Sequence, residues 1–162
     1  MQNRNFLVRS VIVAAALAVT GGALLAWLAS RTEADIAAHR ERVVAEARQA
    51  APTAASATAL AALPAPVQRY FAFTFRGAPP PHASHVELEM EGRFRRPRSE
   101  SFTPTRAEQT IAVHTPALVF AATTPLLPRV PALTARAYDA YAGGQMEMKA
   151  KLLSAITVGD EP

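Results

Sequence analysis

The longest apolar stretch of the chain lies close to its N-terminus. From Val11 to Ala29 the chain runs for 19 residues without a charge. At about 1.5 Å per residue, a helix of that length spans about 28 Å, close to the thickness of a bilayer core. Trp27 lies near the distal end, where an indole ring favours the membrane interface. The pattern predicts a transmembrane helix over residues 11–30, after an N-terminal tail of residues 1–10.

A cleaved signal peptide is the alternative interpretation, with Arg4 and Arg9 as its basic region. The apolar run is longer than the roughly 7–15 residues of a signal peptide. The best cleavage candidate also places bulky Trp27 or Leu28 where a small residue is preferred. We therefore expect a retained single-pass anchor. The basic N-terminal flank favours an N-terminus inside the cell, although arginines beyond residue 30 weaken the asymmetry.

Residues 31–59 predict a juxtamembrane helix followed by a linker. The apolar residues of 31–50 are Ile36, Val43, Val44 and Ala47, on roughly one helical face. Because this stripe is narrow, we expect a solvated helix; a stalk that binds a partner is the alternative. The linker, residues 52–62, is rich in Ala, Thr and Ser.

Period-two alternation dominates the remaining part of the chain, residues 60–162, which we predict to be an antiparallel β-domain. In residues 86–95, apolar side chains alternate with glutamates and arginines, which predicts a strand with one dry and one wet face. Further strands are expected at 107–114, 118–122, 133–141 and 145–154, with Ile156 and Val158 as an extension of the last. Gly143 and Gly144 predict a hairpin turn. A short helix over 63–71 precedes the strands and should dock on them through Val67, Tyr70 and Phe71.

The predicted fold class is α+β: a transmembrane helix, a short helix and a curved antiparallel sheet like an incomplete β-barrel. Each of its five strands has one apolar face, and little helix remains to cover these faces. We expect the sheet to curl on itself, to bind a ligand, or to be completed by a partner or by further chain, because open sheets are usually protected.

The distribution of charge argues against a nucleic-acid binder. The net charge is +4, but residues 77–162 carry nine basic and nine acidic groups. The excess flanks the apolar segment, whereas a nucleic-acid-binding domain needs its own basic face. The chain has no cysteine, so it has no disulfide and no thiol nucleophile.

Four short motifs in the β-domain resemble a bacterial family known only as a domain of unknown function. Leu63–Phe71 resembles its "LPxPVxRY" segment, and Glu91–Arg95 its "xGxFR" segment. Phe102–Gln109 is similar to "WxPFxAxQ", and Asp139–Met148 to "DxYxxGxGxM". Phe102 and Phe120 replace tryptophans of that pattern, Thr105 a phenylalanine and Met146 a glycine. The resemblance implies a curved half-barrel with a helix, like bacterial lipoprotein carriers, in a chain that is a truncated member.

Several side chains are candidates for binding, and each also has a structural interpretation. Gln109 lies on the apolar side of its strand, where a buried amide needs partners, and could fix the register or contact a ligand. Asp139 and Tyr141 could line a binding mouth or serve the neighbouring turn. Arg93 and Arg95, with Arg96 and Arg98, could meet anionic headgroups if their hairpin points towards the membrane, or form a solvated tip.

We predict no catalytic, cofactor-binding or metal-binding residue. The histidines His39, His82, His85 and His114 lack the spacing of a zinc site. Glu87, Glu89 and Glu91 could support acid–base chemistry, but a solvated sheet face explains them as well. The motifs of phosphate loops, serine hydrolases and zinc peptidases are absent from the sequence.

The sequence therefore predicts a non-enzymatic module anchored in the bacterial inner membrane, with its soluble domain outside the cytoplasm. The expected ligand is apolar or lipid-like, because the sheet has more apolar face than cover. The alternative is a membrane-tethered assembly protein whose sheet is completed by a partner. The oligomeric state stays open.

Overall fold

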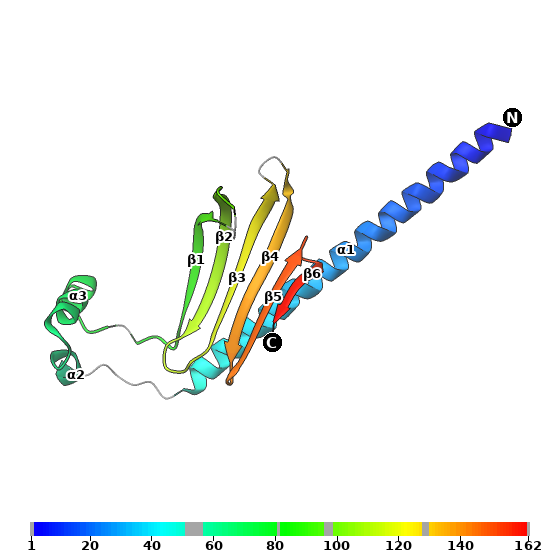
Figure 1. Ribbon diagram of the computed structural model, residues 1–162. Coiled ribbons are helices and arrows are strands. Elements are labelled where there is room, and N and C mark those ends of the chain that lie inside the picture. Colours follow the sequence, from blue (N-terminus) through cyan, green and yellow to red (C-terminus); the bar gives the residue numbers. More distant parts are fainter. Residues whose placement is uncertain (1, 51–56, 81, 96–98, 128–129, 162) are drawn as a thin grey trace.

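The computed structural model describes residues 2–50, 57–80, 82–95, 99–127 and 130–161. It confirms the α+β class, with a long apolar N-terminal helix and a six-stranded open antiparallel sheet (Figure 1). The elements, in chain order, are α1 (Gln2–Gln49), α2 (Ala57–Ala61), α3 (Ala65–Phe75), β1 (His85–Phe94), β2 (Thr103–Ala112), β3 (Leu118–Leu127), β4 (Val130–Ala142), β5 (Gln145–Leu152) and β6 (Ile156–Glu161).

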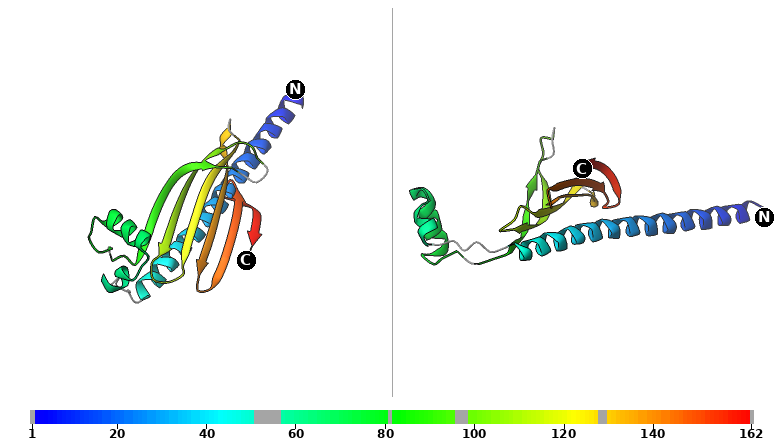
Figure 2. Two further views of the ribbon diagram at one scale, coloured as in Figure 1. Left: turned by 60° about the vertical axis from the view of Figure 1, so that its left-hand side comes forward. Right: turned by 90° about the horizontal axis from the view of Figure 1, so that it is seen from below.

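Helix α1 is continuous over 48 residues. Its N-terminal half projects away from the sheet in every view, and its apolar side chains there are exposed (Figures 1 and 2). Within the described residues, one helix is long and apolar enough to cross a bilayer, and this is α1. That length and composition are consistent with a single-pass anchor or with a signal sequence.

The C-terminal half of α1 packs along the sheet, so the expectation of a solvated helix over residues 31–50 is wrong. Val43 and Ala47 are buried in a cluster with alanines at the β2–β3 and β4–β5 ends of the sheet. Ile36 is buried against Ala121 and Tyr138. A narrow stripe is sufficient because the opposing residues are mostly alanines, which let the helix approach the strands closely. This packing is long-range and was invisible in the local pattern.

The six strands form a simple meander, ordered β1 to β6, and every neighbouring pair is antiparallel. The expected hairpin turn at Gly143 and Gly144 is confirmed, with φ of 59° and 78°. The expected fifth strand is divided in two, because Leu153 and Ser154 take left-handed φ of 53° and 57° and reverse the chain. Ile156 and Val158 therefore belong to β6.

The short helix predicted over 63–71 is observed as α3. Pro66 lies in its first turn, where its missing N–H costs little, and Arg76 caps its end with φ of 52°. Its docking on the sheet is not observed: no residue of α3 is buried, and Phe73 is 86% exposed. Within the predicted linker, Ala57–Ala61 form α2, and residues 51–56 lie outside the described residues.

Candidate functional site

The two faces of the sheet have opposite characters, and the strand register assigns every residue to one of them. Cross-strand partners share a face, so the pairings define rows that run across the sheet. Two rows that face α1 are Glu87–Thr110–Val119–Ala140–Glu147 and Glu89–Glu108–Ala121–Tyr138–Lys149. Two rows of the other face are Val86–Ile111–Leu118–Tyr141–Met146 and Leu88–Gln109–Phe120–Asp139–Met148.

Helix α1 covers the polar face and leaves the apolar one open. The dry face expected for β1 is therefore wrong: Val86, Leu88 and Phe94 are 41%, 40% and 49% exposed. On β5, Met146 and Met148 of the same face are 41% and 39% exposed. We call this apolar side the open face. Alternation along a strand distinguishes two faces, but it does not say which one another element covers.

A charged network joins α1 to the polar face around Arg136, which is 7% exposed. Its guanidinium donates to both oxygens of Glu33 on α1, at 3.1 and 3.0 Å, and to Glu108 Oε1 at 2.6 Å. Nη1 also donates to Thr123 Oγ1 at 3.2 Å. Arg40 of α1 binds the second oxygen of Glu108. The network fixes the helix on the middle of the sheet, because each charge has a partner of opposite sign.

These contacts shift the pKa values of the network. Burial alone would raise the pKa of Glu108, but hydrogen bonds from Arg136 and Arg40 outweigh it and lower that pKa. Burial likewise opposes the charge on Arg136, and the hydrogen bonds to Glu108 and Glu33 raise its pKa nevertheless. Both groups are therefore held in their ionised forms at neutral pH.

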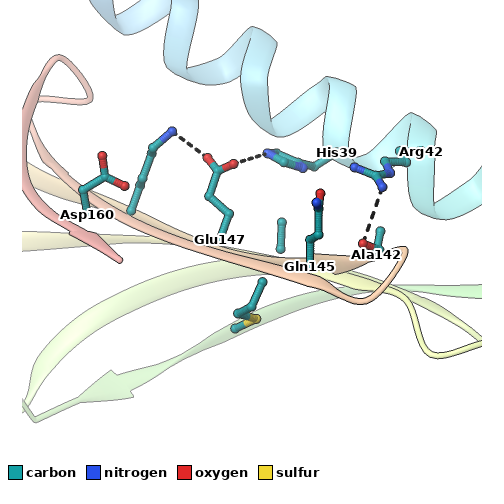
Figure 3. A pocket seen from close by; sticks show the side chains of 9 residues that line it. His39, Arg42, Ala142, Gln145, Glu147 and Asp160 are labelled. Carbon is teal, nitrogen blue, oxygen red and sulfur yellow. Dashed lines mark hydrogen bonds and ion pairs between the residues drawn. The ribbon is translucent and has the colours of Figure 1, made fainter. Parts of the chain in front are cut away.

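A cleft of about 460 Å³ beside α1 gathers a second polar cluster (Figure 3). Glu147 of β5 lies 3.6 Å from His39 Nε2 and 2.6 Å from Lys149 Nζ. Tyr138, 1% exposed, donates its hydroxyl hydrogen to Glu147 Oε1 at 2.8 Å. Arg42 reaches the carbonyl of Ala142 at 3.5 Å. Polar groups from the helix and the sheet converge here, as an acid–base site would require.

The ionisable groups in the cleft are nevertheless paired with one another, which suits neutralisation of charge and not catalysis. The hydrogen bond from Lys149 lowers the pKa of Glu147 against the effect of burial, and Glu147 in turn raises the pKa of Lys149. Burial and the bond to Glu147 raise the pKa of Tyr138. A general base or acid needs a pKa near the working pH, and these shifts move all three groups away from neutrality. The cluster is suited to fastening α1 to β4 and β5.

The open face carries three of the residues singled out from the sequence. Gln109 and Asp139 lie in one row, on either side of Phe120, and Tyr141 lies in the next row beside Leu118. Burial raises the pKa of Asp139. No hydrogen bond joins the side chain of Gln109 or Asp139 to another residue in the described part of the chain. The alternative in which Asp139 serves the neighbouring turn through a hydrogen bond is therefore not observed there.

Arg93 and Arg95 lie apart from that row, at the end of β1. Arg93 Nη2 donates to the carbonyl of Phe102 at 3.4 Å, and the Arg95 guanidinium lies 5.9 Å from the centre of the Phe102 ring. Arg96 and Arg98 fall outside the described residues. The five candidates thus divide into a group on the open face and a basic group at one end of the sheet.

The sequence reasoning missed the polar layer beneath α1. One signal was present: Arg136, Tyr138 and Ala140 alternate with Ala137 and Asp139, which marks two unlike faces of β4. Among the described residues, no three His, Asp or Glu side chains gather closely enough to hold a metal ion.

Residues 61–162 match the family of unknown function DUF6920, and the chain belongs to this family. The matched region begins before α3 and contains the whole sheet. No curated protein and no solved structure matches the chain.

Proposed function

We propose that this DUF6920 protein is a membrane-anchored binding module whose open face receives an apolar or lipid-like ligand. One observation carries the proposal: α1 covers the polar face of the sheet, whereas no described element covers the apolar face. Apolar surface exposed to water is unfavourable by about 25 cal/mol per Å², so an occupant of this face would gain that energy.

The size of the open face supports an occupant. Six strands about 4.8 Å apart and about eight residues long make a face of about 24 by 26 Å, or about 600 Å². The face, which also holds the polar residues Gln109 and Asp139, is therefore as large as the largest apolar patches of monomeric proteins, which are often functional. An extended acyl chain fits within either dimension.

The polar groups within the face favour an amphipathic ligand. Gln109 and Asp139 flank Phe120 in one row, and Tyr141 lies in the next. The raised pKa of Asp139 means that its carboxyl gains protons more readily than an ordinary one. A ligand hydroxyl or amide would meet partners here while its apolar part covers Phe120 and Met148.

The proposed source of such a ligand is the membrane around α1. If its apolar half crosses a bilayer, the sheet is held beside lipid by the same continuous helix that covers its polar face. In this proposal α1 is a retained anchor in a bacterial inner membrane and the sheet lies on the extracytoplasmic side. A topology reporter fused to the C-terminus tests the compartment.

Photo-crosslinking tests the ligand. The full chain would be placed in nanodiscs that contain a phospholipid with a diazirine at the end of its acyl chain, and adducts would be mapped by mass spectrometry. We expect adducts on Phe120 and Met148 as well as on α1, whereas the helix-facing Tyr138 stays unlabelled. The double variant Leu88→Gln/Met148→Gln should lose the adducts on the sheet. Phe73→Gln, at an exposed site on α3, is the matched control and should retain them.

Adducts confined to α1 would contradict lipid binding by the open face. In that case the second candidate, self-assembly through this face, predicts that the protein sediments as a larger species at higher concentration. The favouring observation is the exposure of apolar side chains on both edge regions, β1 and β5–β6. A monomer at all concentrations would contradict it.

A further inference from the structure

One end of the sheet points towards the apolar half of α1. Along β3, Val119 belongs to the cluster around Val43, and Ala121 to the cluster around Ile36. The next helix-facing residue of β3, Thr123, is bonded to Arg136, which holds Glu33. Each step along β3 therefore moves towards the N-terminus of α1. The continuation of β3 to Leu127 follows the same direction (Figure 1).

The strands reach the level of α1 at which the charge-free run ends, at Ala29. Thr32 of α1, whose hydroxyl donates to the carbonyl of Ser154 in the β5–β6 turn, lies only three positions after Ala29. From Thr123 to Leu127 the strand advances about 13 Å, along a line inclined to α1 (Figure 1). From Glu33 to Ala29 the helix advances only about 6 Å. The β3–β4 tip thus reaches the level of the apolar segment.

The side chains at this end suit a membrane interface. Leu127 and Val130, which pair at the β3–β4 tip, are 48% and 45% exposed. The β1–β2 connection lies at the same end of the strands and is flanked by exposed Phe94 and Phe102. Exposed apolar residues on two neighbouring tips match the way in which peripheral proteins enter the headgroup layer.

The same end has an excess of positive charge. Arg31, Arg93 and Arg95 form no ion pair with any described residue. Arg31 lies over the ring of Trp27, at 5.7 Å, where α1 would leave the bilayer. The nearby carboxylates Glu33 and Glu91 are neutralised by Arg136 and Arg106, and Glu100 remains in the β1–β2 loop. We define the anchor-proximal rim as Arg93, Phe94, Arg95, Phe102, Leu127 and Val130.

We propose that the anchor-proximal rim rests in the headgroup layer of an anionic bilayer. Leu127 and Val130 enter the interface, and Arg93 and Arg95 contact lipid phosphates. The inference rests on the proposed anchoring of α1, and it does not need a ligand on the open face. Its consequence is a fixed orientation: the strands stand on the membrane with the β2–β3 and β4–β5 turns pointing away from it. The open face then meets the bilayer along one edge.

Depth-dependent quenching tests the rim in the full chain. The sequence contains no cysteine and one tryptophan, so a single introduced cysteine gives a unique label and Trp27 reports the anchor. Leu127→Cys and, as control, Val113→Cys would each carry an environment-sensitive dye. Both positions are equally exposed, at 48% and 49%, but they lie at opposite ends of the sheet. Nanodiscs with and without anionic phosphatidylglycerol would contain lipids with a nitroxide at the headgroup.

We expect quenching of Trp27 and of the dye at 127, with at least about twofold more quenching at 127 than at 113. Equal quenching at 127 and 113, with Trp27 quenched, overturns the rim but leaves the anchor and the open face as proposed. If Trp27 escapes quenching by any lipid, the anchor itself is refuted, and the rim with it. Photo-crosslinking of the open face is read out separately, so the two failures are distinguishable.

A charge reversal tests the basic part of the rim. In anionic discs, Arg93→Glu/Arg95→Glu should reduce quenching at 127 to the value measured in neutral discs. Arg48→Glu/Arg69→Glu, at exposed sites on α1 and α3 away from the rim, is the matched control and should leave quenching at 127 unchanged. A rim variant that quenches as strongly as the parent would refute the contact with lipid phosphates.

Discussion

Replacement of Arg136 by leucine removes the central charge of the layer between α1 and the sheet. The parent side chain makes four hydrogen bonds, two to Glu33 and one each to Glu108 and Thr123. Leucine has no donor and fills most of the same space near the backbone. The substitution therefore asks how much the charged network stabilises the packing of α1 on the strands.

The expected loss follows from the surroundings of the two carboxylates. Removal of one partner from a fully buried ion pair costs about 3–5 kcal/mol, because a charge is left unpaired. Here the Glu33 side chain is 53% exposed and that of Glu108 is 36% exposed, so water solvates both after the substitution. Glu108 also keeps Arg40 as a partner. We therefore expect Arg136→Leu to lower the free energy of unfolding by about 2 kcal/mol.

Pulse proteolysis of the full chain in mild detergent micelles, over a series of urea concentrations, measures this loss. The matched control is Arg106→Leu, in the same row of the sheet but two strands away, where both side chains of the 2.9 Å ion pair with Glu91 are exposed. Exposed pairs contribute about 0–1 kcal/mol, so the control should change little. Glu33→Gln combined with Arg136→Leu should cost less than the sum of the two single changes, because the residues are in contact.

A loss below about 0.5 kcal/mol for Arg136→Leu, or one no larger than that for Arg106→Leu, would refute a stabilising role of the charged network. Either result would mean that small-residue packing alone holds α1 on the sheet. If Arg136→Leu costs about 2 kcal/mol but the double variant Glu33→Gln/Arg136→Leu costs the full sum of the two single changes, the direct bond between Glu33 and Arg136 is contradicted.

Three further results are expected. The pKa values of Glu108 and Glu147 are lowered by folding, so the stability that these carboxylates contribute is complete above the ordinary value of 4.5 and disappears as the pH falls through the folded values. The urea midpoint should therefore fall with decreasing pH in this range, and Arg136→Leu should make this dependence on pH weaker. Ile36→Ala should lower stability by about 2 kcal/mol in the same assay, because Ile36 is buried between α1 and the sheet; an effect below about 0.5 kcal/mol would contradict that packing. Gly143→Ala should cost about 1 kcal/mol, because φ is 59° and the new methyl would lie 2.7 Å from Arg42 Nη2; a neutral result, measured by the urea midpoint, would show that the turn relaxes freely.

Sequence reasoning was most reliable where a signal repeats along one element. The period-two alternation located β1 to within a residue, and the glycine pair identified the β4–β5 turn. It failed at the boundary between β5 and β6, because Leu153 and Ser154 take a backbone conformation that their residue types rarely adopt. Gln109 was placed on the apolar side of its strand from the sequence, whereas only the register brings Asp139 into the same row.

The sequence by itself determined that an uncharged helix-length run precedes strands with two unlike faces. These are local properties, since they depend only on spacing along one segment. Only the tertiary structure decided that α1 covers the polar face, because Glu33, Arg40 and His39 find their partners on strands some 70 to 110 positions away. Pairing between distant charges leaves no periodic trace in the chain. The same long-range contacts direct the rim towards the apolar half of α1 and leave the open face to an occupant.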